Sequence, residues 1–168
     1  FEDGMTEDDV PTLRCTCEDY DDFSANDFMG FVEFDIRKYT HRRHRDWYEL
    51  LPDPKKPKEV VSGKLEIVLR WWHNPELAWE PFLDSTDVDD VEPNELLVAL
   101  VRGRELAPRD ACGLSFKPVT SDPQVRFRII DTDERAQSTH KIKTLAPRWN
   151  EEFGLYCVPG ELPVLRVV

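Results

Sequence analysis

Hydrophobic residues recur at every second position in several short stretches of the chain. In residues 13–18 the side chains of Leu13, Cys15 and Cys17 alternate with polar ones, and residues 65–72, 125–129 and 152–157 follow a similar pattern. This spacing is typical of strands with one buried face. Residues 95–101 are apolar on both faces, as in a central strand, and residues 164–168 begin another. Since no stretch of twelve or more residues has a helical stripe, the pattern predicts an all-β protein with many short strands, as in a sandwich.

Length and cysteine content set broad limits. The chain has 168 residues, the length of one domain or of two small ones. Its four cysteines include no C-x-x-C pair, so a zinc ribbon or a thioredoxin-type site is not indicated, and a cytosolic protein is favoured. The sequence opens on Phe1 rather than on Met, from which we expect a piece of a longer polypeptide.

The net charge of −12 is unevenly distributed along the chain. Residues 1–75 carry −6, residues 76–94 carry −7 with no basic residue, and residues 95–168 carry +1. The middle stretch therefore reads as an acidic linker between two β units. The overall charge argues against nucleic-acid binding, which depends on cationic contacts to phosphates.

An acidic stretch after the first predicted strand carries the candidate chemistry. Asp19, Asp21 and Asp27 have the spacing D-x-D-x5-D, and Asp22 adds a fourth carboxylate. Carboxylates crowded into one short loop repel each other unless they are fully solvated or share a cation. A hard divalent ion such as Ca²⁺ takes several oxygen ligands and accepts irregular loop geometry. The spacing alone leaves both a solvated acidic loop and a calcium site open.

The same stretch resembles the third calcium-binding loop of a C2 domain. In that family two aspartates, a loop tip and a third aspartate are followed by a hydrophobic pair and a glycine, here Phe28, Met29 and Gly30. The segments FVEFDI, WYEL and GKLEIVLRW that come next resemble the closing part of a C2 module. The resemblance implies an antiparallel C2-type β-sandwich.

A second resemblance to the family begins after the linker. The segment ELLVALVRGRELAPRD resembles an opening strand and ends in Asp110 on a first loop, and S-D-P at 121–123 and P-x-W-N-E at 147–151 fit the same module. Residues 1–75 would then be the C-terminal part of one module and residues 95–168 the N-terminal part of the next. We favour a fragment of tandem modules. The alternative is that both parts close into one permuted sandwich, which would bring Asp110 and Asp122 beside the three aspartates of the acidic stretch.

The resemblance implies Ca²⁺-dependent docking to an anionic phospholipid membrane, by a non-catalytic module at the cytoplasmic face. The implied calcium ligands are Asp19, Asp21, Asp27, Asp110 and Asp122, although eleven residues separate the last two, more than is usual in the family. Phe23 at the loop tip would enter the membrane. Lys141 and Lys143, expected on one strand face, would contact lipid headgroups.

Two other functions remain open at this point. Many C2 domains bind no calcium and serve as structural or protein–protein interaction modules in large assemblies, and the acidic linker suits that role. Alternatively, an enzyme could carry its catalytic domain outside this chain and use the C2 part for targeting. The sequence itself shows no supported catalytic triad and no glycine-rich phosphate loop, so we expect no enzymatic activity from these residues.

Overall fold

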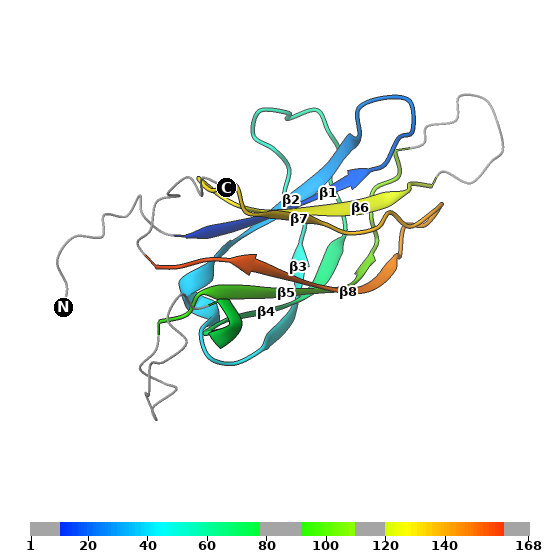
Figure 1. Ribbon diagram of the computed structural model, residues 1–168. Coiled ribbons are helices and arrows are strands. Elements are labelled where there is room, and N and C mark those ends of the chain that lie inside the picture. The colour runs from blue at the N-terminus through cyan, green and yellow to red at the C-terminus, as the bar shows by residue number, and fades with distance from the viewer. Residues whose placement is uncertain (1–10, 78–91, 110–119, 160–168) are drawn as a thin grey trace, which may run out of the picture.

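A computed structural model describes residues 11–77, 92–109 and 120–159 (Figure 1). In these ranges the chain forms eight strands and two short 3-10 helices. They are β1 Thr12–Asp19, β2 Asp27–Asp35, η2 Ile36–Tyr39, β3 His44–Glu49, β4 Lys64–Trp72, η3 Pro75–Leu77, β5 Glu95–Arg104, β6 Pro123–Ile129, β7 Arg135–Gln137 and β8 Arg148–Tyr156.

The strands form two four-stranded antiparallel sheets, with the orders β2-β1-β6-β7 and β3-β4-β5-β8. The alternating apolar side chains of both sheets form one buried core. Aromatic pairs join the sheets: Phe127 of β6 meets Phe153 of β8 at 5.0 Å between ring centroids, and Phe34 of β2 meets Tyr48 of β3 at 4.7 Å. The expected antiparallel β-sandwich is confirmed (Figure 1).

Each sheet contains strands from both sides of the acidic linker. In the first sheet β1 pairs with β6, so that Leu13 lies opposite Ile129 and Asp19 lies opposite Pro123. In the second sheet β4 pairs with β5, from Lys64 opposite Arg104 to Trp72 opposite Glu95. The front and back parts of the chain thus share one core. The proposed module boundaries at residues 75 and 95 stay a prediction.

The structure corrects the sequence-based prediction in one segment. Lys141 and Lys143, expected along a strand face, lie in an irregular segment with a turn between β7 and β8, and Lys143 has a positive φ of 51°. The strand expected at residues 164–168 lies outside the described residues, as does Asp110.

One end of the sandwich, called the apex below, holds the candidate site. Here β1 ends and β2 begins, joined by residues 20–26, the acidic loop. Here β3 also ends and β4 begins, joined by residues 50–63, which we call the lysine loop. Figure 1 shows both loops projecting from the same end of the molecule.

Candidate functional site

The acidic loop is shaped by its own polar side chains. The Asp21 amide donates a hydrogen bond to Asn26 Oδ1 at 3.2 Å, and Ser24 Oγ donates to Asp21 Oδ2 at 3.0 Å. Asn26 Nδ2 in turn donates to Glu18 Oε2 at 3.2 Å. These bonds fold the loop over the end of β1 and hold its tip away from the core.

Asp19 and Asp122 lie side by side at the base of the acidic loop. The Asp122 amide donates to Asp19 Oδ1, and the Tyr20 amide donates to the Asp122 carbonyl at 3.0 Å. The Lys143 amide donates to Asp122 Oδ1 at 2.6 Å. Asp19 is 4% exposed. Each of the two carboxylates therefore joins backbone segments that are distant in sequence, whatever else it binds.

The five predicted calcium ligands are only partly brought together. Asp19 and Asp122 are neighbours, Asp21 is half-buried and Asp27 is exposed. Carboxylate oxygens suit Ca²⁺ chemically. In the part of the chain that the structure describes, however, no three acidic, histidine or cysteine side chains form a group able to hold a metal ion. The calcium site stays a prediction.

The tip of the acidic loop presents an aromatic side chain to solvent. Phe23 is fully exposed, at 102% of the reference area, and Asp22, Ser24 and Ala25 beside it are exposed as well. At the loop base the Tyr20 ring stacks on His140 at 4.3 Å between centroids. A hydrogen bond with Asp22 and the charge of that carboxylate raise the pKa of the Tyr20 phenol. Phe23 thus projects into solvent beside a carboxylate.

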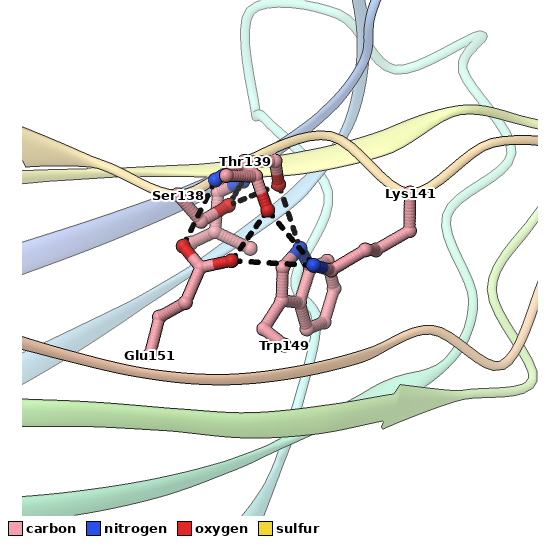
Figure 2. Close-up of polar contacts among 6 residues, drawn as sticks. Ser138, Thr139, Lys141, Trp149 and Glu151 are labelled. Carbon is pink, nitrogen blue, oxygen red and sulfur yellow. Dashed lines mark hydrogen bonds and ion pairs between the residues drawn. The ribbon is translucent and has the colours of Figure 1, made fainter.

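Lys141 is engaged in a polar network with the P-x-W-N-E segment at the start of β8 (Figure 2). Its Nζ lies 3.3 Å from Glu151 Oε1 and 2.9 Å from Thr139 Oγ1, and Trp149 Nε1 donates to the Thr139 carbonyl at 2.9 Å. Desolvation acts to raise the pKa of Glu151, but the bonds from Thr139 and Lys141 outweigh it and lower that pKa. Lys141 therefore has an intramolecular partner, whereas Lys143 is exposed.

Exposed arginines on the outer face of the first sheet were not singled out from the sequence. Arg126 and Arg128 alternate along β6, and Arg128 lies directly opposite Arg135 of β7. Arg128 and Arg135 line a shallow hollow with Thr132 and Asp133. Among the described residues neither guanidinium forms an ion pair, whereas Arg126 pairs with Glu18. The alternation of Val125, Arg126, Phe127 and Arg128 was the available signal, but it was used only to predict the strand.

Comparison with known proteins places these features in a family. The chain is 30% identical over 112 residues to Synaptotagmin-3 of Arabidopsis thaliana, covering 66% of this chain and 19% of that protein. It is 25% identical over 146 residues to Synaptotagmin-7 of Mus musculus, and equally to that of Homo sapiens, covering 85% of this chain and 30% of each relative. The chain thus spans 19% of the length of the first relative and 30% of the length of the other two. No solved structure matches it significantly.

The described residues include no helix long and apolar enough to cross a membrane. The family model for the C2 domain matches residues 3–50 and 94–168. These two ranges supply strands to both sheets of the sandwich, and they include the acidic loop and the S-D-P and P-x-W-N-E segments. The chain belongs to the C2 domain family.

Proposed function

We propose that this chain is a non-catalytic C2 module that docks a larger protein on an anionic phospholipid membrane in a Ca²⁺-dependent manner, as a peripheral protein at the cytoplasmic face. Family membership and the synaptotagmin relatives support membrane docking. The observation that carries the proposal is Phe23, fully exposed at the tip of a loop that its own hydrogen bonds hold away from the core.

Membrane insertion gives the exposed aromatic ring a physical role. Moving a Phe side chain out of water is worth about 1.5–3 kcal/mol, but the fold itself leaves this gain unused at Phe23. The carboxylates of Asp21, Asp22 and Asp27 oppose the approach of anionic lipid. A cation bound at the loop would remove that repulsion, so calcium dependence follows from the position of the acids next to the apolar tip.

Calcium would be held by Asp19, Asp21, Asp27, Asp110 and Asp122, and when bound it would neutralise the loop and offer a positive charge to lipid phosphate. Lys143 is proposed as a further headgroup contact, since it is exposed and forms no ion pair among the described residues. Lys141 is the weaker candidate because Glu151 and Thr139 already contact its ammonium group.

Co-sedimentation with vesicles of phosphatidylcholine, with or without phosphatidylserine, tests this function in Ca²⁺ and in EGTA. We expect binding that needs both phosphatidylserine and Ca²⁺, and a loss of about ten-fold or more in Asp21→Asn and in Phe23→Ala. Asp131→Asn is the matched control, since Asp131 is exposed and follows the opposite end of β6. Unchanged calcium-stimulated binding in both apex variants would contradict the proposal.

A calcium-independent structural or protein–protein interaction module is the second candidate. It is favoured by the bonds that Asp19 and Asp122 make to backbone amides, and by the absence of a three-ligand group in the described ranges. Isothermal titration calorimetry with Ca²⁺ separates the two. No heat of binding, together with equal vesicle binding in Ca²⁺ and EGTA, would favour the structural module.

A further inference from the structure

We propose that the lysine loop is a second contact for the anionic lipid surface, beside the acidic loop, so that the docking surface has a basic and an acidic part. This inference rests on the proposed membrane docking and adds to it the residues Lys55 and Lys58, which lie outside the acidic loop and the P-x-W-N-E region. The argument uses the rigidity of the loop, its attachment to the acidic side of the apex, and its exposed charges.

The lysine loop is held in one conformation by backbone hydrogen bonds. Phe31 and Leu51 exchange both amide bonds, at 3.1 and 2.7 Å, and the Leu50 amide donates to the Gly63 carbonyl at 3.0 Å. Within the loop the Lys56 amide donates to the Asp53 carbonyl at 2.8 Å. Prolines at positions 52, 54 and 57 restrict the backbone further. A preorganised loop loses little conformational entropy when it contacts a surface.

Arg109 ties the lysine loop to the base of the acidic loop. Its Nε donates to the Phe28 carbonyl at 3.0 Å and its Nη2 donates to the Val60 carbonyl at 2.8 Å. The Lys56 ammonium lies 5.4 Å from the centroid of the Phe28 ring, in a cation–π contact. Phe28 is the second residue of β2, the strand that follows the acidic loop, so the two loops are adjacent and can meet the same surface.

The outward charges of the lysine loop are free to bind an external anion. Lys56 pairs with Glu59 at 3.5 Å, but for the exposed side chains of Lys55 and Lys58 no ion pair is found within the described ranges. Val60, two residues after Lys58, is 71% exposed and adds an apolar contact. Unpaired ammonium groups next to an exposed aliphatic side chain complement an anionic lipid headgroup layer.

The acidic loop has no basic residue at its tip and therefore does not attract anionic lipid by itself. The lysine loop beside it supplies that attraction. A basic residue close to an anionic membrane strengthens binding by about five-fold, so two of them contribute about 25-fold, with a strong dependence on salt. Since the charge of lysine does not depend on calcium, this contribution is present in both Ca²⁺ and EGTA. The lysine loop therefore supplies attraction that the acidic loop cannot supply by itself.

The test is co-sedimentation of the chain with vesicles of phosphatidylcholine and phosphatidylserine at low salt. We expect Lys55→Ala/Lys58→Ala to bind about 25-fold more weakly than the unchanged chain, and Lys55→Arg/Lys58→Arg to bind nearly normally. The control is Lys38→Ala/Arg42→Ala, which removes the same charge from exposed residues in and after η2, at the end of β2 far from the apex. We expect the control to change binding less than about two-fold.

The outcomes separate this inference from the proposed function. If the alanine pair binds like the control while Asp21→Asn still loses calcium-stimulated binding, the lysine loop is not a contact and the membrane function stands. If the unchanged chain binds no vesicle in Ca²⁺ or EGTA, both proposals fall. A loss confined to the alanine pair, restored by arginine and reduced by salt, supports the lysine loop.

Discussion

Within the described ranges, charged side chains are paired on the outer face of the second sheet but unpaired at the tip of the lysine loop at the apex. On the outer face of the second sheet Glu66, only 5% exposed, accepts hydrogen bonds from Arg45 at 2.7 Å and from Arg102 at 2.6 Å. At the apex Lys55 and Lys58 have no ion-pair partner among the described residues. The paired charges of Glu66, Arg45 and Arg102 stabilise the folded chain, whereas the unpaired ammonium groups of Lys55 and Lys58 are available to bind an anionic ligand.

Strand register explains the difference. Trp47 lies opposite Glu66, which lies opposite Arg102, so cross-strand pairing places these side chains together. The guanidinium groups of Arg102 and Arg104 also lie 5.2 and 4.3 Å from the Trp47 ring. The apex loops have no partner strand along most of their length, and their charges are placed by local turns instead. The comparison predicts that changes at the outer face of the second sheet alter stability, whereas changes of charge at the apex alter binding.

Gly30→Ala is expected to change both stability and vesicle binding, because Gly30 lies where β2 contacts the lysine loop. We expect the largest loss of stability for this variant. Gly30 has φ of 134°, and an added Cβ would lie 2.7 Å from Val61 Cγ1 and 2.8 Å from Leu50 Cβ. The substitution strains the backbone and pushes the lysine loop away from β2, which should cost about 3 kcal/mol. Urea unfolding measures the loss, and vesicle binding should weaken with it.

The matched control for Gly30→Ala is Gly154→Ala in β8. Its Cβ would meet the end of the flexible Glu95 side chain, which is able to move, and its φ is not positive. We expect a loss of about 1 kcal/mol or less. Equal losses at the two glycines would show that the contact between β2 and the lysine loop has no special role.

Glu66→Gln tests whether a paired charge on the outer face of the second sheet affects stability without affecting vesicle binding. It removes the negative charge that Arg45 and Arg102 share, but both arginines are partly exposed and regain water. We therefore expect a loss of about 2 kcal/mol in the free energy of unfolding, below the range for a fully buried pair. Vesicle binding should not change.

The control is Glu33→Gln, which breaks the exposed pair with Arg14 and should cost less than about 0.5 kcal/mol. If Glu66→Gln weakened vesicle binding without unfolding the chain, the sheet face would take part in docking, and the separation of the two regions would be wrong.

The strands and the family were predictable from sequence, because alternation and the motifs around Asp19 and Pro147 are local. The pairing of β1 with β6 was open, since it joins residues more than a hundred positions apart and periodicity says nothing about partners. Lys141 was misplaced for a related reason. Lysines at alternate positions are typical of a strand face. In the structure, however, the Lys141 ammonium group contacts Thr139 and Glu151.

The candidate site shows the same limit. Four closely spaced aspartates suggested a shared cation, but the hydrogen bond from the Asp122 amide to Asp19 is visible only once the strands are paired. The lysine loop gave a signal in the segment PDPKKPKE. Its position beside the acidic loop depends on Arg109 and Gly30, which are distant from it in sequence.

The smallest expected effect is the acid response of the network in Figure 2. Because the pKa of Glu151 is lowered in the folded chain, its stabilising bonds are present above the ordinary glutamate pKa and are lost as the pH falls through the folded value. The melting temperature, measured by thermal unfolding, should therefore decrease when the pH is lowered below about 4.5. At neutral pH the Glu151→Gln variant should be less stable than the unchanged chain by less than about 1 kcal/mol in the free energy of unfolding. Its melting temperature should then decrease less steeply as the pH is lowered. Parallel curves for the two proteins would mean that the bonds of Glu151 to Thr139 and Lys141 contribute no proton-linked stability.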